Sequence, residues 1–443
     1  MPQTAQIIDF EKYRRALADL TLYKVKGKVT ELTGLVVKAV VPNVRIGELC
    51  LIESFYRKEP IKAEVVGFKD NNVLLMPLGD LEGIGPGNDV VPTRHCLMVP
   101  VGFELLGRVL DGLGDPMDTA QKGELKCREF YPVHTSPPDP LSRKRVTHPI
   151  SVGVKAIDAM LTAGEGQRLG LFAAAGVGKS VLMGMIARNT EADINVICLV
   201  GERGREVRDF LEQDLGPEGL KRSVIVCSTS DKPSLVRSKA AYVATAIAEY
   251  FRDHEKKVLL MMDSVTRFAR ALREIGLAVG EPPARQGFTP SVFSTLPRLL
   301  ERAGNSDKGS ITAFYTVLVE GDDMNEPVAD EVRSILDGHV ILSRDLANRG
   351  HYPAINVSES ISRVMTNIVD PEHTAAAQKL KEVVANYEKE RDLILIGAYE
   401  AGSNPAVDYA IEKIDEVNNF LRQGIEEPVS FEEAVEGLKG LFE

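Results

Sequence analysis

The segment RLGLFAAAGVGKS, residues 168–180, decides the fold of this 443-residue chain. Its first half is an apolar run of the kind that forms a strand buried on both faces, and a glycine-rich turn follows it. Strand, turn and helix in this order are the structural setting of a phosphate-binding P-loop. The usual pattern begins with a glycine where this chain has Ala173, but the closing GVGKS at 176–180 is complete.

The chemistry of this segment predicts a nucleotide site. The backbone N–H groups of a glycine-rich turn can approach phosphate oxygens closely. Lys179 would neutralise the β- and γ-phosphates, and Ser180 would coordinate Mg²⁺. The alternative is a chance Gly-Lys-Ser turn, which the flanking strand and helix disfavour. The residues predicted to bind the phosphates of ATP are Ala174, Ala175, Gly176, Val177, Gly178, Lys179, Ser180 and Val181.

Apolar runs that resemble further strands alternate with helical stretches from about residue 96 to residue 368. The clearest helical stretch runs from Pro233 to His254, with a proline near its first turn. This alternation predicts an α/β fold with a mainly parallel sheet and helices on both sides. Ligands of such sheets bind beyond the carboxyl ends of the strands. The predicted strands are 168–174, 194–200, 223–229, 258–264, 310–319 and 339–343.

One of these strands, VLLMMD at 258–263, ends in an acid in the form of a Walker B motif. Asp263 would hold Mg²⁺ through its water shell, opposite Ser180. An isolated acid at the end of a strand is more often a turn or a helix cap, and Ser264 is a rival cap. The position of Asp263 after a P-loop, in a parallel sheet, favours the metal-binding role.

A charged turn, GERGRE at 201–206, follows the strand at 194–200 and therefore lies on the same rim as the P-loop. ATP hydrolysis needs a group that orients or deprotonates the attacking water, and a carboxylate near the γ-phosphate can do this. Glu202 is nearest to the strand end and is our candidate, with Glu206 as its rival. The structural alternative is a solvated turn whose carboxylates begin a helix.

The N-terminal part of the chain has a different pattern. Residues 1–20 place apolar side chains at helical spacing, which predicts either a helix packed on its own domain or a docking helix for a partner. From Lys24 to about Thr93, short runs rich in Val, Leu and Ile are separated by turn signals. Several short strands in so little sequence predict a small β-barrel, which serves assembly and carries no visible chemistry.

The C-terminal part is predicted to be helical from about Pro371 to the end. Good helix formers cover 374–396, a Gly-Ser-Asn-Pro break follows, and a second helix ends at Arg422. A last short helix fits 430–442. The predicted domains are a docking helix at 1–20, a β-barrel at 21–95, a nucleotide-binding domain at 96–368 and a helical domain at 369–443.

Composition limits the functional classes. Hydrophobic residues make up 44% and charged residues 26% of the chain, an ordinary globular balance. The net charge of −11 argues against a nucleic-acid binder. No apolar run approaches the roughly 18 residues of a membrane span, so any membrane association is expected to be peripheral. The five cysteines form no CxxC pair, which fits reduced thiols in a cytosolic protein better than disulfides or zinc.

Several longer motifs resemble one family, the type III protein-export ATPases. These enzymes are homohexameric relatives of the catalytic subunit of rotary ATP synthase. The likeness covers nearly the whole chain, is strongest from about 150 to 368, and fits the flagellar and injectisome branches alike. The segments that carry it are GVGKS, GERGRE, VLLMMDS, GEPPARQGFTPSVF, GSITAFYTVLVEGDDMNEPVADEVRSILDGHVILSR at 309–344 and GHYPAINVSESISRVM.

The resemblance implies a β-barrel, a RecA-like nucleotide-binding domain and a helical C-terminal domain. It also implies Mg²⁺-dependent ATP hydrolysis at the subunit interfaces of a homohexamer. Within the motifs, Lys179 and Ser180 would be the P-loop pair and Asp263 the Walker B acid. Glu202 would be the catalytic carboxylate, with Arg203 as its neighbour in the active site.

Two further residues take roles from the resemblance alone. Arg363 matches an arginine finger that reaches the ATP of the neighbouring subunit, and Tyr352 matches the aromatic residue that stacks on adenine. Without the family, a surface arginine and a packed tyrosine would be the simpler interpretations. The chain departs from many relatives at Ala174, where they have a second glycine.

The resemblance also implies partners and a location. A stator-type regulator would bind the N-terminal helix, and a coiled-coil central stalk protein and chaperone–substrate complexes would bind the C-terminal helices. The ATPase would act in the cytoplasm at the inner face of the plasma membrane, where it would unload chaperones and promote substrate entry into a membrane export gate. No nucleic-acid partner is expected.

Two other functions use the same core. A subunit of a rotary ATP synthase would require a second, related subunit, whereas here the P-loop, the carboxylate and the matching arginine lie in one chain. A ring-shaped nucleic-acid motor would need a basic groove with stacking aromatic residues. The negative net charge and the aromatic content of 6% disfavour it. ATP hydrolysis in a protein-export apparatus is therefore the preferred function.

Overall fold

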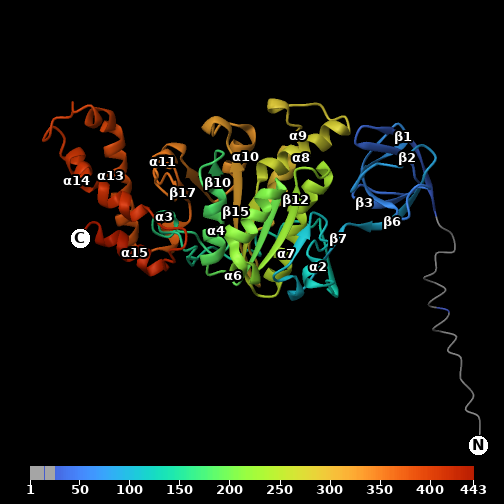
Figure 1. Cartoon of the computed structure of the whole chain (residues 1–443), viewed down its shortest axis with the longest axis horizontal. Helices are drawn as coiled ribbons and strands as arrows, with labels where there is room; N and C mark the ends of the chain where they lie inside the picture. Colours follow the sequence, from blue (N-terminus) through green and yellow to red (C-terminus); the bar gives the residue numbers. More distant parts are fainter. Residues whose placement is uncertain (1–13, 15–24) are drawn as a thin grey trace, which may run out of the picture. The chain divides into compact units, whose positions relative to one another are not determined.

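The structure, a computed structural model, describes Arg14 and residues 25–443 (Figure 1). The chain divides into two compact units, 1–96 and 97–443. The helix expected over 1–20 lies outside the described residues, apart from Arg14. All five cysteines are free thiols, and no helix in the described part of the chain combines the length and apolarity needed to cross a bilayer.

The first unit contains a closed six-stranded barrel, as predicted. Residues alternate between the interior and the surface, most regularly in β3, because successive side chains of a strand point to opposite faces. Val37, Ile52 and Leu75 are completely buried inside. Closure leaves the sheet without an edge strand. The strands are β1 (Gly27–Thr33), β2 (Val36–Val40), β3 (Glu48–Glu53), β4 (Ile61–Lys69), β5 (Asn72–Pro77) and β6 (Asp89–Cys96), in the order β1-β2-β5-β4-β3-β6.

A mainly parallel sheet forms the centre of the second unit, and each of the six predicted strands is present in it. All nine residues of β11 are buried, as a strand covered on both faces requires. Only the two-residue strands β14 and β17 run antiparallel. The order is β17-β16-β10-β15-β13-β11-β12-β8, with β14 beside β15. The bounds are β8 (Val109–Asp111), β10 (Arg168–Ala173), β11 (Ile194–Glu202), β12 (Ser223–Thr229), β13 (Lys257–Asp263), β14 (Gly304–Asn305), β15 (Ser310–Leu318), β16 (Gly338–Leu342) and β17 (Ile361–Ser362).

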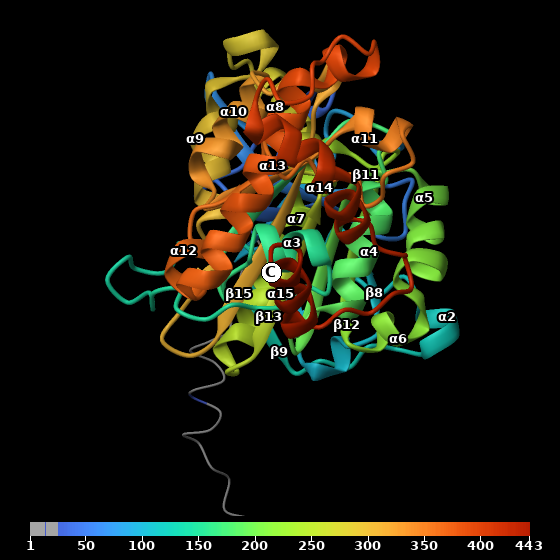
Figure 2. The ribbon, with the colours of Figure 1, turned by 90° about the vertical axis from the view of Figure 1, so that its left-hand side faces the viewer.

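Helices cover both faces of this sheet. Figure 2 shows α4 and α6 on one side of strands β13 and β15, and α9 and α10 on the other. Helix α7 begins directly after Pro233, as predicted, and packs along β11, β12 and β13. The α-helices of this region are α2 (Thr119–Lys122), α3 (Lys155–Met160), α4 (Lys179–Asn189), α5 (Gly204–Asp209), α6 (Gly216–Lys221), α7 (Ser234–Asp253), α8 (Val265–Ala278), α9 (Pro290–Leu300), α10 (Pro327–Ile335), α11 (Arg344–Asn348) and α12 (Met365–Ile368).

Shorter elements complete the region around the sheet. Strands β7 (Met98–Val101) and β9 (Glu129–Pro132) form a separate antiparallel pair. A π-helical segment, Phe210–Leu215, joins α5 to α6. Single 3₁₀ turns occur at Phe103–Leu105, Arg285–Gly287 and Glu320–Asp322.

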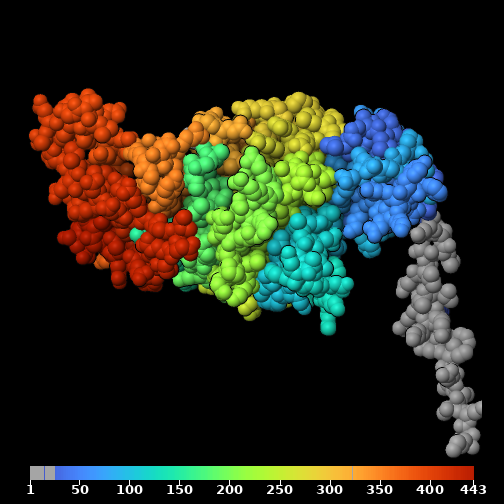
Figure 3. Space-filling model, viewed as in Figure 1, coloured from blue at the N-terminus to red at the C-terminus, as the bar shows by residue number. Residues whose placement is uncertain are grey.

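Three helices end the second unit: α13 (Pro371–Leu395), α14 (Pro405–Leu421) and α15 (Phe431–Gly440). Helix α13 starts at Pro371, as predicted, and Asp370 caps it by accepting the His373 N–H at 2.7 Å. Leu380 of α13 and Val417 of α14 are buried in the same apolar core as the strands. Figure 3 accordingly shows these helices as a lobe that is continuous with the sheet region.

Candidate active site

The predicted P-loop joins the carboxyl end of β10 to the first turn of α4. Gly176 and Gly178 have φ angles of 81° and 87°, a left-handed conformation that glycine adopts at least cost. Neither Ala173 nor Ala174 has a positive φ, so neither position of the turn requires glycine. The side chains of Ala174 and Val177 are buried, whereas Ala175, Gly176 and Ser180 are exposed.

Charged side chains that follow or end β10, β13 and β11 meet at this edge of the sheet. Lys179 forms an ion pair with Asp263 at the end of β13, and its Nζ lies 3.8 Å from Oε1 of Glu202 at the end of β11. Asp263 also accepts a hydrogen bond from Thr316 of β15 (2.7 Å). The structure therefore brings together the lysine and the two acids that the sequence analysis selected, and phosphate oxygens would compete with these acids for Lys179.

Glu202 has the electrostatic environment of a group that exchanges protons near neutral pH. Burial is the main factor that raises the pKa of Glu202 to about 7, and the negative charge of Asp263 and a hydrogen bond with Glu206 act in the same direction. The charges of Lys179 and Arg267 oppose this rise. A carboxyl group with such a pKa can accept a proton during hydrolysis at neutral pH.

The neighbouring charged residues of the GERGRE turn lie nearer the surface and form no ion pair with the P-loop lysine. The hydrogen bond with Glu202 is the main factor that lowers the pKa of Glu206. The side chain of Arg203 is 77% exposed and pairs with Glu206 at 2.7 Å. The structure thus brings Glu202, but not Arg203, into contact with the P-loop lysine, and the geometry favours Glu202 over Glu206 as the carboxylate nearest the phosphates.

Arg363 lies at the opposite end of the sheet from the P-loop of its own chain. It follows β17, whose Ser362 pairs with Gly338 at the start of β16, and its N–H donates to the Asp337 carbonyl at 2.9 Å. Strand β10 runs parallel to β16 and carries the P-loop at its far end. At about 3.3 Å per residue, β10 alone separates the two by about 17 Å. Arg363 therefore cannot serve the P-loop of its own chain.

A mostly apolar cavity of about 350 Å³ adjoins the P-loop. The half-exposed Tyr352 lies beside it, and its ring is 3.5 Å from the position that a Cβ on Gly178 would take. The cavity has room for a flat ring against Tyr352. Its lining residues are Gly176, Val177, Gly178, Val181, Leu182, Met185, Leu342, Tyr352, Pro353, Ala354, Gln423 and Ile425.

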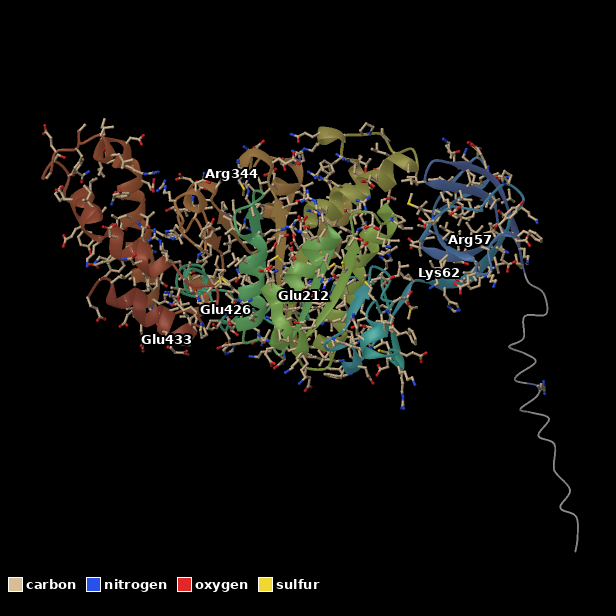
Figure 4. All side chains as sticks on the ribbon, in the orientation of Figure 1. Arg57, Lys62, Glu212, Arg344, Glu426 and Glu433 are labelled. Carbon is tan, nitrogen blue, oxygen red and sulfur yellow. The ribbon has the colours of Figure 1, made fainter. Side chains whose placement is uncertain are left out.

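The segment between α14 and α15 supplies one wall of this cavity and is firmly attached. The buried Gln423 donates its N–H to the Tyr352 carbonyl (3.1 Å), and its side chain accepts the Lys155 N–H (2.8 Å). Arg188 at the end of α4 donates to the Ile425 carbonyl (2.8 Å). It also pairs with the neighbouring Glu426 at 3.6 Å, which is labelled in Figure 4.

Three family models match consecutive parts of the chain. The beta-barrel domain of the ATP synthase alpha/beta family matches residues 29–94, and the nucleotide-binding domain of that family matches residues 153–362. The T3SS EscN ATPase C-terminal domain matches residues 369–440. A flagellum-specific ATP synthase of Bacillus subtilis is 55% identical over 422 residues, which cover 95% of each chain. This chain belongs to the family of flagellar and type III secretion ATPases.

Other relatives of this export ATPase agree with that assignment. A type 3 secretion system ATPase of Xanthomonas euvesicatoria is 52% identical over 422 residues, again 95% of each chain. The solved structure of the assembled ATPase EscN from the enteropathogenic E. coli type III secretion system has a TM-score of 0.89 at 47% identity. EscN in complex with its central stalk EscO has a TM-score of 0.87 at 46% identity. Each match covers 94% of this chain and 99% of EscN.

The family assignment settles the reaction at the level of class. The export ATPase hydrolyses ATP, and the interpretation as an export ATPase is supported over that of a rotary synthase subunit. The residues around the P-loop fit the nucleotide chemistry that this class requires, because they combine a lysine, exposed backbone and buried carboxylates at the carboxyl edge of a parallel sheet.

Three residues of the site were missed by the sequence analysis. Arg267, in the first turn of α8, contacts Glu202 at 3.1 Å. Thr316 follows the last pair of the β13–β15 register, Met262 with Tyr315, and is one of several polar residues in its strand, so the sequence did not single it out. Gln423 gave no local signal, because only the tertiary fold brings the α14–α15 segment to the cavity.

The oxygen donors near the P-loop fit a hydrated Mg²⁺. Among the side chains that the structure describes, no group of three or more His, Cys, Asp or Glu could hold a metal ion. Mg²⁺ commonly keeps several waters and takes its remaining ligands from one or two carboxylates and from substrate phosphates. The exposed hydroxyl of Ser180 and the carboxylate of Asp263 are donors of this type.

Proposed function

We propose that this ATPase works as a homohexamer in a type III protein-export apparatus, with each ATP site completed by Arg363 of the neighbouring subunit. The placement of Arg363 carries the proposal. Its side chain is exposed, makes no ion pair or hydrogen bond within residues 25–443, and lies at the end of the sheet away from its own P-loop. A head-to-tail ring of identical subunits would bring this arginine to the ATP of the next copy.

The catalytic step that we propose is in-line attack of water on the γ-phosphate. The base of ATP would lie against Tyr352, and Lys179 and the P-loop N–H groups would hold the phosphates. Glu202 would orient the water and accept its proton. Arg363 of the next subunit would stabilise the charge that develops on the transferring phosphoryl group. Bound Mg²⁺, held by Ser180 and through water by Asp263, would share that charge.

The export role follows from the family. EscN is known with its central stalk EscO, and we propose a stalk of the same kind at the C-terminal helices of this chain. The same helices would receive chaperone–substrate complexes for delivery to a membrane export gate. The N-terminal segment would bind a stator-type regulator. The enzyme would act in the cytoplasm at the inner face of the plasma membrane.

The test of the shared site is ATPase activity measured against protein concentration, with wild type and Arg363→Ala side by side. We expect wild-type specific activity to rise cooperatively with concentration, because each site needs two subunits. Arg363→Ala should still bind ATP but lose turnover by about 10³-fold or more, the usual effect of removing an arginine finger. Activity that is independent of concentration and of Arg363 would show a self-contained site and overturn the proposal.

A further inference from the structure

A buried polar cluster lies at the amino end of strand β10, away from the ATP site. Gln167, directly before the strand, is completely buried. Its side-chain amide donates to the Asp337 carbonyl (3.1 Å) and to the Ser362 hydroxyl (3.0 Å). Its side-chain oxygen accepts the Gly164 N–H (2.8 Å). Both N–H groups and the oxygen of the amide are therefore used, as burial of a polar group requires.

The two groups that accept from this amide both lie next to the Ser362–Arg363 peptide bond. The Asp337 carbonyl also accepts the N–H of Arg363 (2.9 Å), and Ser362 immediately precedes Arg363. The Ser362 hydroxyl donates in turn to the Thr162 carbonyl (3.0 Å). Strand pairing of β17 with β16 covers only two residues, so the ladder itself contributes little to holding this segment. The Gln167 amide adds two side-chain contacts to this short pairing, next to Arg363 itself.

Arg168 also holds Asp337, through the Asp337 side chain. Its carboxylate accepts two hydrogen bonds from the Arg168 guanidinium (3.0 and 3.1 Å) and one from the Arg168 N–H (3.1 Å). The partly buried, bidentate geometry makes this a strong and directional pair. The backbone that carries Arg363 is thus attached to the first residues of β10, while the Arg363 side chain remains exposed.

We propose that Gln167 is a positioning residue for catalysis at the neighbouring subunit, because it holds the backbone of Arg363 in the orientation that places its guanidinium in the next ATP site. This inference rests on the proposed role of Arg363. Removing the amide would leave the Asp337 carbonyl and the Ser362 hydroxyl with one partner fewer and let β17 shift. A displacement of about 1 Å at a catalytic group can cost about 10²-fold in rate.

The same cluster and the chain's own P-loop lie at the two ends of one short strand. Strand β10 lies between β15 and β16 and pairs with both. These pairings on both sides hold the strand, so a change at Gln167 is expected to leave the P-loop at its far end in place.

The test uses mixed rings of two inactive variants. Glu202→Gln subunits keep Arg363 but cannot hydrolyse ATP, and Arg363→Ala subunits keep the carboxylate but supply no arginine. Mixing them should restore activity at interfaces where the first variant donates its arginine to the second. Gln167→Met, which removes the amide at similar volume, is then introduced into one variant at a time.

The position of the substitution decides the outcome. In the Glu202→Gln subunit, Gln167→Met should lower the restored activity by about 10²-fold. In the Arg363→Ala subunit, the same substitution should leave it nearly unchanged, because that subunit donates no arginine. Equal losses in both subunits would show a general structural role, and no loss in either would show that the amide is dispensable. Each of these results overturns the inference.

Two controls separate the possible failures. If Glu202→Gln and Arg363→Ala do not restore activity together, the shared site itself is wrong, whatever Gln167 does. If Gln167→Met does not fold or assemble, Ser362→Ala removes one of the two contacts and should show a smaller loss with the same asymmetry. Thermal unfolding and ring assembly of each variant are measured alongside.

Discussion

The two ends of the parallel sheet organise their functional side chains in opposite ways. At the carboxyl end, Lys179, Asp263 and Glu202 are largely buried and face one another, and the charges of Asp263 and Lys179 act in opposite directions on the pKa of Glu202. At the amino end, buried groups hold the backbone of Arg363 while its side chain is exposed. The first arrangement suits chemistry within the subunit, whereas the second suits the presentation of a group to another molecule.

The largest expected effect within the carboxyl end comes from Glu202→Gln. The substitution removes the group that accepts the proton of the attacking water, so kcat should fall by about 10³-fold while ATP binding is kept. Steady-state hydrolysis and equilibrium binding of ATP measure the two quantities. Because Lys179 and the P-loop backbone are unchanged, a large loss of affinity would indicate that Glu202 is structural. Normal turnover would move the catalytic role to Glu206.

The pH dependence of kcat/KM tests the raised pKa of Glu202 at the carboxyl end of the sheet. Glu202 has a pKa of about 7 and must be ionised to act as a base, so kcat/KM should rise with pH through about 7 and then level off. The hydrogen bond with Glu206 stabilises the protonated form of Glu202, so Glu206→Gln should lower the pKa of Glu202. The rising limb should then move to lower pH, while turnover above pH 7 is retained. A shift to higher pH, or loss of turnover, would contradict these assignments.

The comparison also separates what the sequence could predict from what it could not. The P-loop, the Walker B strand and Glu202 are local patterns: an apolar strand followed at once by the chemical group, which a parallel sheet then collects at one edge. Gln167 has no such pattern, because its function depends on the pairing of two residues of β17 with β16, nearly 200 positions later. Gln423 likewise depends on the packing of the C-terminal helices.

Arg363 lies between these two cases. Its motif resembled that of an arginine finger, but its spacing in the sequence says nothing about which end of the sheet it occupies. That information comes from the antiparallel register of β17, which places it beside Asp337 rather than beside the P-loop. Short edge strands are poorly predicted because two residues carry almost no periodicity.

The smallest expected effect concerns Ala174, which directly follows strand β10 at the start of the P-loop turn. Ala174 is buried and has no positive φ, so the turn does not need glycine at this position. Ala174→Gly should leave ATP affinity nearly unchanged and lower stability by about 0.5–1 kcal/mol, because glycine gains freedom in the unfolded chain. Calorimetric titration and thermal unfolding measure the two effects.

Gly178→Ala is the matched opposite substitution in the same turn. The φ of 87° would strain an alanine, although the Cβ itself would be in ordinary contact with the Tyr352 ring at 3.5 Å. Relief of that strain would change the turn that holds the phosphates, so ATP affinity should fall together with stability. Ala174→Gly is compared directly with Gly178→Ala: equal losses of ATP affinity would mean that the flexibility of the loop, and not its left-handed positions, controls phosphate binding. The carboxyl end of the sheet would then be less rigid than its buried ion pairs suggest.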